Sequence, residues 1–424
     1  MAIGVLRSAM IVDLNSGAES GLCNIVMEDG VIKEITTSPW PGEAAWIFDA
    51  DGLWVVPGLI DLHVHLTATS VHLAESGALP SSLVAFECQP RMEDMLCRGF
   101  TTVRDAGGAD WGLAQAVEKG LLVGPRVFVS GRALSQSAGH GDFRGRYADT
   151  QDACGCSLHR GLGSIARIVD GVDAVRLAAR DEFRRGASQL KMMLSGGAAS
   201  PIDPIETVQY SEEEISAGVA EASAWNTYVM AHAYTPKAIA RAVRCGVRSI
   251  EHASLVNAEV ASLMAESGAV AVPTLATFDA LGRFGSELGF SDSGMAKVRL
   301  IRDAGQAALA TLKAAGTLIG FGTDLLGDLQ RFQCREFELR RAVQSPLEML
   351  RSATLDAAKI LQMDGQLGEI REGAVADLVV AHQNPATSAD VLGADGRGLR
   401  AVVKGGNLAV VDRALVAGTR NQRG

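Results

Sequence analysis

Residues 59–66 read LIDLHVHL, an apolar run that carries His63 and His65 two positions apart. In a β-strand, side chains two residues apart project from the same face, so both imidazoles are expected to point the same way. Two imidazoles on one face of a buried strand can share a metal ion. The alternative is a pair of packed core histidines, which is the better interpretation of one histidine but not of two at this spacing. The run therefore predicts a buried strand with a metal-binding end.

Seven further short apolar runs follow this one, and stretches with helical periodicity separate them. They are TTVRDA (101–106), RVFVSG (126–131), QLKMML (189–194), YVMAHA (228–233), SIEHAS (249–254), AVAVPT (269–274) and TLIGFGTD (317–324). Strands that alternate with helices are typical of α/β folds with a parallel sheet. Eight such units predict a (β/α)8 TIM barrel. An open, doubly wound sheet is the rival fold, but no Gly-x-Gly-x-x-Gly turn supports it.

Both chain ends have a different pattern. Residues 1–56 alternate apolar and polar positions around Asn-Ser-Gly and Asp-Gly turns, and ADLVVA (376–381) and LRAVVKGGNLAVV (399–411) do the same. We expect a small β-sandwich built from residues 1–56 and 368–424, with the barrel over residues 57–367. Helix starts are also marked in the sequence, because Ser211 and Glu214 form a capping box and Pro236 and Pro346 occupy first helical positions.

Further polar residues stand at the expected strand ends. His232, His252 and Asp324 end the fifth, sixth and eighth runs, and Lys191 lies within the fourth. Barrel enzymes keep their active sites at the carboxyl ends of the strands, so these side chains are expected to converge. A buried lysine can lose its proton and take up CO₂, which gives an anionic ligand able to bridge two metals. A structural salt bridge of Lys191 is the alternative.

The composition excludes several classes of protein. The 424 residues carry a net charge of −10, which argues against a nucleic-acid partner. No apolar run is long enough for a membrane span, and the first residues lack a signal-peptide pattern, although a removed leader would leave no trace. Seven scattered cysteines indicate reduced thiols and a cytoplasmic protein.

The strand-end residues, taken in order and spacing, resemble those of the amidohydrolase superfamily: His63, His65, Lys191, His232, His252 and Asp324. The segments PGLIDLHVH (57–65) and Gly373 to Leu378 are also similar to that superfamily, and the resemblance covers nearly the whole chain. Ser-Gly-Gly after the fourth run, SAGHGD (137–142) and His-Ala-Tyr (232–234) resemble the imidazolonepropionase-like branch. Within it, the sequence resembles first the bacterial zinc dipeptidases that cleave Xaa-Pro and related dipeptides (prolidases), and the ochratoxin-hydrolysing amidases look similar and are not separated from them by the sequence.

The resemblance implies two divalent metal ions, with zinc as the expected metal. One ion would be held by His63, His65 and Asp324 and the other by His232 and His252, with N6-carboxylated Lys191 bridging them. A metal-bridging hydroxide would then attack the amide carbonyl of a dipeptide or an N-acyl amino acid. Asp324 is expected to pass the proton to the leaving nitrogen. Relatives of this kind also imply a homo-oligomer that acts on a small-molecule substrate.

Substrate contacts are expected from side chains at the rim of the barrel. By the same resemblance His140 and Tyr234 would bind the substrate, and His140 is well placed to polarise the carbonyl oxygen. Tyr234 could equally be an amphipathic rim residue. Arg144 and Arg160 are candidate carboxylate clamps, because guanidinium binds carboxylate through two parallel hydrogen bonds. The alternative for both is an arginine that is simply solvated, as most loop arginines are.

Residues 132 to about 170 form a glycine-rich stretch that we interpret as a long loop and a functional lid. Cys154, Cys156 and His159 within it are too few ligands for a structural zinc. A cyclic-amide hydrolase and a lactonase remain open because they use the same metal pair. A purine-type deaminase is disfavoured by Lys191 and by the lack of a glutamate close after His232. A silent scaffold is disfavoured by the complete ligand set, and a metal store by Asp324 and the lid.

Overall fold

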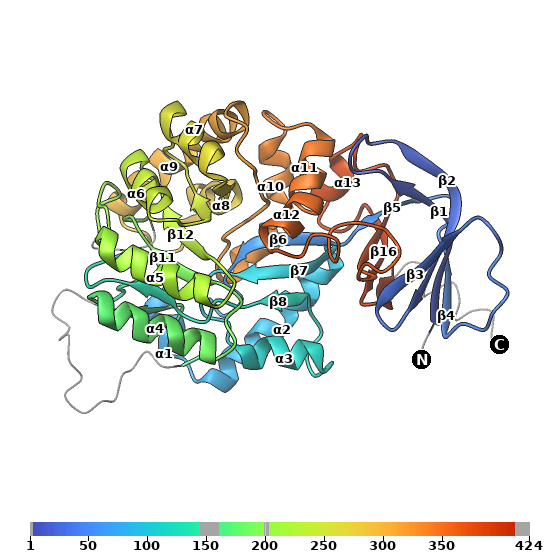
Figure 1. Ribbon diagram of the computed structural model, residues 1–424, viewed down its shortest axis with the longest axis horizontal. Coiled ribbons are helices and arrows are strands. Elements are labelled where there is room, and N and C mark those ends of the chain that lie inside the picture. Colours follow the sequence, from blue (N-terminus) through green and yellow to red (C-terminus); the bar gives the residue numbers. More distant parts are fainter. Residues whose placement is uncertain (1–2, 145–160, 199, 201–202, 412–424) are drawn as a thin grey trace. The chain divides into compact units, whose positions relative to one another are not determined.

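The computed structural model describes residues 3–144, 161–198, 200 and 203–411. The chain divides into two compact units (Figure 1). One comprises Met1–Asp61, Glu93–Thr102 and Phe337–Gly424, and the other comprises Leu62–Met92 and Val103–Glu336.

The first unit is built around a sheet to which both ends of the chain contribute. Its strands are β1 (Ile3–Val12), β2 (Glu19–Glu28), β3 (Val31–Thr36), β4 (Trp46–Asp49), β5 (Trp54–Pro57), β15 (Leu378–Ala381), β16 (Leu399–Lys404) and β17 (Asn407–Val411). The order is β17-β16-β15-β5-β1-β2-β3, and β4 pairs with β1. The expected β module formed by both termini is therefore present, as one hydrogen-bonded sheet.

Local sequence explains how this sheet turns. Asp29 and Gly30 link β2 to β3 with φ angles of 50° and 83°, the left-handed backbone that a two-residue hairpin turn requires. The alternate apolar positions of the strands pack into one buried cluster, which includes Leu6, Ile25, Met27, Val55, Val380 and Val403. Its helices are α10 (Arg335–Arg340, which begins just before the unit), α11 (Pro346–Ser352), α12 (Leu355–Ile360) and α13 (Asp390–Gly393).

Short, mostly buried parallel strands form two further sheets. A three-stranded sheet holds β6 (Leu59–Val64), β7 (Phe100–Asp105) and β8 (Arg126–Phe128), and the first residues of β6 and β7 are counted with the first unit and the rest with the second. A six-stranded sheet has the order β10-β9-β11-β12-β13-β14. Its strands are β9 (Ala133–Ser135), β10 (Ala166–Ile168), β11 (Leu190–Met193), β12 (Val229–Ala233), β13 (Ser249–His252) and β14 (Val270–Val272). The result is a mixed α/β fold with parallel sheets, as the sequence predicts.

Two details differ from the expectation. Residues 317–324 form no strand and make only one bridge, between Ile319 and Ala271. The stretch from residue 132 to about 170 is not wholly a loop, because β9 and β10 lie in it and pair with each other, and β9 also pairs with β11. Each of these two strands has only three residues, too few for a period-two pattern to be recognised.

Helices connect the parallel strands. They are α1 (Leu73–Ala78), α2 (Ser81–Cys97), α3 (Trp111–Glu118), α4 (Val172–Arg184), α5 (Glu212–Ala224), α6 (Pro236–Arg244), α7 (Ala258–Ser267), α8 (Leu275–Phe284), α9 (Asp292–Ala314) and the 3₁₀ helix η1 (Gly327–Phe332). The capping box of Ser211 and Glu214 is confirmed at the start of α5, and Pro236 and Pro346 begin α6 and α11 as predicted. Figure 1 shows α4 and α5 packed side by side.

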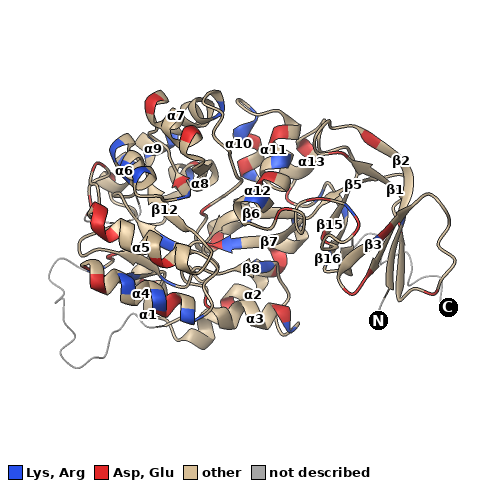
Figure 2. Cartoon of the chain, viewed as in Figure 1, with Lys and Arg blue, Asp and Glu red and all other residues tan. Residues whose placement is uncertain are grey.

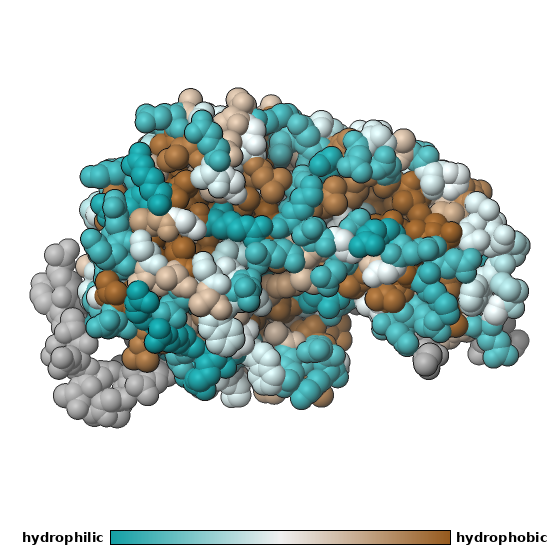
Figure 3. Space-filling view, viewed as in Figure 1, coloured by the Kyte–Doolittle hydropathy of each residue, from teal (hydrophilic) through white to brown (hydrophobic). Residues whose placement is uncertain are grey.

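The surface is mixed in character. Helix α4 carries basic and acidic side chains together rather than a basic stripe (Figure 2). Polar residues cover much of the face in Figure 3, with smaller apolar areas between them. None of the described helices combines the length and the apolar composition that a membrane span requires.

Candidate metal centre

Two histidines and one aspartate meet where β6 ends. Asp324 Oδ1 lies 3.4 Å from His63 Nε2 and 3.3 Å from His65 Nε2. One ligand atom from each of the three residues falls within 4.8 Å of the others. The two imidazoles thus reach the same carboxylate, as their spacing predicts. Two imidazole nitrogens and one carboxylate oxygen are a donor set that suits zinc.

The hydrogen bonds on the far side of each ring decide which nitrogen faces Asp324. His65 Nδ1 lies 2.8 Å from the carbonyl oxygen of Gly107, which can only accept, so Nδ1 carries the proton. His63 Nδ1 lies 2.7 Å from Glu251 Oε2, and an ionised carboxylate likewise only accepts. In both rings Nε2 therefore carries the lone pair, and it lies toward Asp324. Burial alone would lower the pKa of His65, but the neighbouring Asp324 raises it overall, which shows that the site favours a positive charge there.

Positive backbone angles concentrate at this site. The φ angle is 69° at His252, 49° at Ala253 and 54° at Asp324. Non-glycine residues in this region cost on the order of 1–3 kcal/mol each and typically gather where function requires a particular geometry. The Asp324 amide donates to the His63 carbonyl oxygen over 2.8 Å, which holds the carboxylate beside the end of β6.

His232 and His252 stand next to this group. Their ring centroids are 4.8 Å apart, and the His252 ring lies 4.9 Å from the His63 ring. Burial lowers the pKa of both histidines well below the ordinary value, so both are neutral, the form that binds metals. His232 Nε2 is 3.2 Å from the Gly196 carbonyl oxygen and therefore donates to it, which leaves Nδ1 as its free lone pair.

Lys191 lies on β11 beside Met230 of β12 and is 1% exposed. Burial lowers its pKa to about 8, although Glu251 and Asp324 oppose the shift. The ammonium also lowers the pKa of both His232 and His252, so it stands close to both. Within the described part of the chain no ion pair of Lys191 within 4.0 Å is present, although the charges of Glu251 and Asp324 act on it.

Three charged residues of the site were missed in the sequence analysis. Arg104 and Glu251 are fully buried and form an ion pair of 2.9 Å, and Asp105 is buried beside them. Asp105 accepts hydrogen bonds from the amides of Leu66 and Gly107 and so shapes the backbone around His65. The sequence pattern that could have identified them is a charged residue within an apolar strand, as in TTVRDA and SIEHAS.

His140 and Tyr234 lie against the proposed ligands. The His140 ring stacks on His232 with centroids 4.2 Å apart, and the Tyr234 ring is 4.5 Å from His232. A Cβ at Gly197 would come within 2.0 Å of the His140 ring, so only glycine fits there. The close approach of the His140 ring explains why the second glycine of the Ser-Gly-Gly segment has no side chain.

A buried carboxylate stands behind His140. Asp203 Oδ2 is 3.6 Å from His140 Nδ1 and accepts from the Gly197 amide over 2.9 Å. Gln209 donates to the same oxygen and accepts from the His140 amide. The Lys297 ammonium donates to the carbonyl oxygens of Gly197, Ser200 and Asp203. Although burial would raise the pKa of Asp203, His140 and other donors hold it at about 2.

Arg144 has a partner within the chain. Its Nε and Nη2 donate to the two oxygens of Asp142, each over 2.7 Å. The planar fork therefore already holds a carboxylate, and a substrate would have to replace it. Arg160, Cys154, Cys156 and His159 lie outside the described residues.

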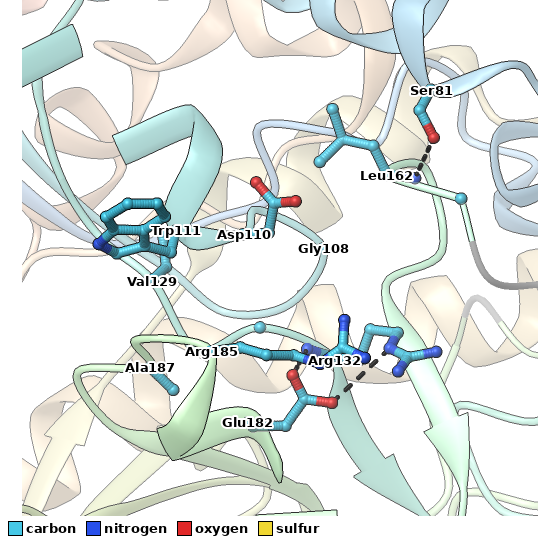
Figure 4. Close-up of a pocket in the computed structure, with 12 residues that line it drawn as sticks. Ser81, Gly108, Asp110, Trp111, Val129, Arg132, Leu162, Glu182, Arg185 and Ala187 are labelled. Atoms are coloured by element: carbon cyan, nitrogen blue, oxygen red, sulfur yellow. Dashed lines mark hydrogen bonds and ion pairs between the residues drawn. The ribbon is translucent and has the colours of Figure 1, made fainter. Parts of the chain in front are cut away.

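A cavity of about 370 Å³ is lined mainly by residues 71–75 and 289–297, and none of the proposed ligands is among its lining residues. Its walls include Phe143, Ala198, Phe290 and Lys297. A smaller cavity of about 180 Å³ contains none of the proposed ligands (Figure 4). In this smaller cavity the side chain of Arg132 faces that of Glu182, and the two opposite charges form an ion pair.

Known proteins resemble this chain over most of its length. The model of the amidohydrolase family matches residues 54–419. Ochratoxinase of Aspergillus niger is 33% identical over 371 residues, which are 84% of this chain and 75% of that protein.

Solved structures are similar over almost the whole chain. A prolidase complexed with N-methylphosphonate-L-proline has a TM-score of 0.93 and 48% identity, and the match covers 97% of this chain and 100% of that one. A Xaa-Pro dipeptidase with methionine bound in its active site has a TM-score of 0.82 and 25% identity, covering 96% and 99%.

Proposed function

Because the chain belongs to the amidohydrolase family and is a hydrolase of amide bonds, we propose that it uses two metal ions to cleave a dipeptide or an N-acyl amino acid. The observation that carries the metal part is the convergence of His63, His65 and Asp324 within 4.8 Å. Their nitrogen and oxygen donors suit zinc, and both Nε2 atoms are unprotonated by virtue of their outer partners.

His63, His65 and Asp324 would hold one ion, and His232 and His252 the other, with carboxylated Lys191 between them. Support for the second group is the neutrality of both histidines and the low pKa of Lys191, about 8. When bound, such ions lower the pKa of water and polarise a carbonyl oxygen.

Asp324 is the proposed proton carrier. Its side chain is 19% exposed, whereas those of His63, His65 and His252 are 6% exposed or less. It is therefore the ligand that substrate and water can reach. Although burial would raise the pKa of Asp324, His63 and His65 hold it well below its ordinary value, so it begins the cycle as a carboxylate able to accept a proton. It would then deliver that proton to the leaving nitrogen.

His140 and Tyr234 are the proposed substrate contacts, because their rings lie against that of the proposed ligand His232. Each offers a hydrogen-bond donor to a carbonyl or carboxylate oxygen. Arg144 would join them only by exchanging Asp142 for the substrate carboxylate.

The substrate class has two main candidates. Similarity to a prolidase at 48% identity favours an Xaa-Pro dipeptide. An ochratoxin-type N-aryl-acyl-phenylalanine amide is the alternative, favoured by the ochratoxinase relative and by the cavity lined by Phe143 and Phe290. Its volume of about 370 Å³ can hold an aromatic side chain, and Phe143 and Phe290 offer apolar contacts on walls that also carry polar residues. Cyclic amides and lactones are the remaining class.

We also infer that the parallel strands close into one barrel. Leu62 donates to the Phe321 carbonyl oxygen, and Gly320 donates to that of Ala271, which links β6 to β14 through residues 317–324. Ser188 donates to the Val129 carbonyl oxygen, which links the end of β8 to the start of β11. The division into residues 1–56, 57–367 and 368–424, the homo-oligomer and the cytoplasmic location stay predictions.

A substrate panel tests the proposal. Zinc-loaded, bicarbonate-supplied protein is assayed for amino acid released from Xaa-Pro, Xaa-Arg and N-acyl-Phe substrates, with Asp324→Asn as the control. We expect release from one of them together with about two bound zinc ions per chain. Absence of bound metal, or equal turnover by Asp324→Asn, would refute the proposed mechanism. If no amino acid is released from any of the three substrates, cyclic amides and lactones become the expected substrate class.

A further inference from the structure

A chain of buried charges leads away from the proposed metal centre. Glu251 Oε2 accepts from His63 Nδ1 over 2.7 Å, and Glu251 Oε1 accepts from Arg104 over 2.9 Å and from the Ser249 hydroxyl over 2.6 Å. Arg104 also donates to the Leu62 carbonyl oxygen and the Tyr228 hydroxyl. Arg104, Glu251 and Ser249 are all 0% exposed.

Such a group is not explained by stability alone. Removing two charges from water costs more than their attraction commonly returns, and well-packed apolar side chains are often equally stable or better. Both carboxylate oxygens of Glu251 have hydrogen-bond partners, so the polar groups of this buried network are satisfied. Among the described residues the network is joined to the metal centre by the hydrogen bond between Glu251 and His63.

The position of Glu251 makes this contact rigid. Glu251 lies in β13 between two neighbouring strands, paired with His232 of β12 and with Val272 of β14. Arg104 holds it from β7. His63 is thereby oriented by residues of strands β13 and β7 rather than by a loop.

We propose that the Arg104–Glu251 pair is a positioning device for His63, an inference that rests on the proposed metal centre. The carboxylate of Glu251 fixes the proton of His63 on Nδ1, so that the lone pair is on Nε2, beside Asp324. The negative charge of Glu251 also makes the His63 imidazole a stronger electron-pair donor to a metal ion. Arg104 holds the carboxylate in place by donating to its other oxygen. Loss of such an outer partner typically weakens metal binding by 10- to 100-fold.

The other histidines differ in this respect. The Nδ1 atom of His65 donates to a neutral carbonyl oxygen, and that of His252 lies 2.8 Å from the Thr274 hydroxyl. His232 donates to a carbonyl oxygen. Among the four proposed histidine ligands, His63 is the one with a charged outer partner in the described structure. The effect of Glu251 should therefore be concentrated on the ion held by His63.

The test is Glu251→Gln, which keeps the shape of the side chain and removes its charge. The matched control is Glu182→Gln: Glu182 is also buried and paired with arginine, 2.9 Å from Arg167, but it contacts no histidine. Zinc dissociation constants of both full-length variants are measured by competition with a chelator. We expect one of the two zinc ions to bind about 10- to 100-fold more weakly in Glu251→Gln, and wild-type binding in Glu182→Gln.

Should Glu251→Gln fail to fold, Ser249→Ala removes only the hydroxyl that donates to Glu251 and should weaken the same zinc ion to a smaller degree. Unchanged zinc binding in the folded variants, or equal weakening in Glu182→Gln, overturns the inference. Wild-type protein that binds no zinc would instead refute the metal centre itself, so the two failures are distinguishable.

Discussion

The buried amine of Lys191 gives the sharpest prediction about how the centre assembles. Only a neutral amine reacts with CO₂, and burial lowers the pKa of Lys191 from 10.5 to about 8. At pH 7 about a tenth of such an amine is neutral, whereas an ordinary lysine is neutral in roughly 0.03% of molecules, a difference of about 300-fold. The neutral fraction rises with pH and levels off above about 8. Carboxylation at fixed dissolved CO₂ should follow the same curve.

The assay starts from protein stripped of metal by a chelator at pH 6 in CO₂-free buffer. Zinc is then restored at fixed dissolved CO₂ and at a series of pH values, and ¹³C NMR with labelled CO₂ follows the carbamate. We expect the initial rate of carbamate formation to rise about tenfold from pH 6 to 7 and to level off above about pH 8. A rate that does not depend on pH would contradict the neutral-amine argument.

Variants test the ligand role of the same lysine. Lys191→Ala should lose most zinc-dependent turnover, and a short carboxylate such as propionate should restore part of it, because it can occupy the vacated space and supply the missing anion. Lys237→Ala, at an exposed position of α6, is the matched control and should behave as wild type. Full turnover by Lys191→Ala without added carboxylate would refute the reasoning.

Three further predictions concern single side chains. Asp324→Asn should lower kcat by about 10²- to 10⁴-fold while much of the zinc stays bound, as turnover and metal analysis would show, because the amide cannot accept the proton. Phe290→Ala should raise KM about tenfold for substrates with an aromatic side chain and spare those with a small one, whereas Phe284→Ala, outside that cavity, should change neither; equal effects on both substrates would exclude the cavity as the binding pocket. Asp203→Asn should raise KM about tenfold with a smaller change in kcat, because His140 loses its buried partner, and an unchanged KM would contradict that role.

Elements with strong local signals could be predicted from the sequence. The hairpin turn at Asp29-Gly30 and the capping box of Ser211 and Glu214 each depend on a few adjacent residues, and the structure contains both. The buried strands were recognisable as apolar runs between turn residues. The strand-end histidines could be recognised because a polar residue at the end of an apolar run has few structural reasons to be there.

The run at 317–324 shows where this reasoning stops. Its sequence suggests a strand, but Gly320 and Gly322 alternate with its apolar residues, and only Ile319 makes a bridge. A Cβ at Gly322 would lie 3.0 Å from the His63 Cβ and 2.4 Å from a Val272 methyl group. The glycine is there because two other segments approach it closely, and that approach is a property of the folded chain alone.

The pair Glu251 and His252 could not have been placed by pattern for a related reason. Adjacent residues of a regular strand point to opposite faces, so the period-two rule assigns only one of them to the metal side. Yet Glu251 reaches one edge of the His63 ring, and the His252 ring lies 4.9 Å from the same imidazole. The left-handed φ of 69° at His252 breaks the alternation at the last residue of β13. The same strained residue therefore lets one strand end supply both a proposed metal ligand and the carboxylate that orients another, which no reading of side-chain periodicity can anticipate.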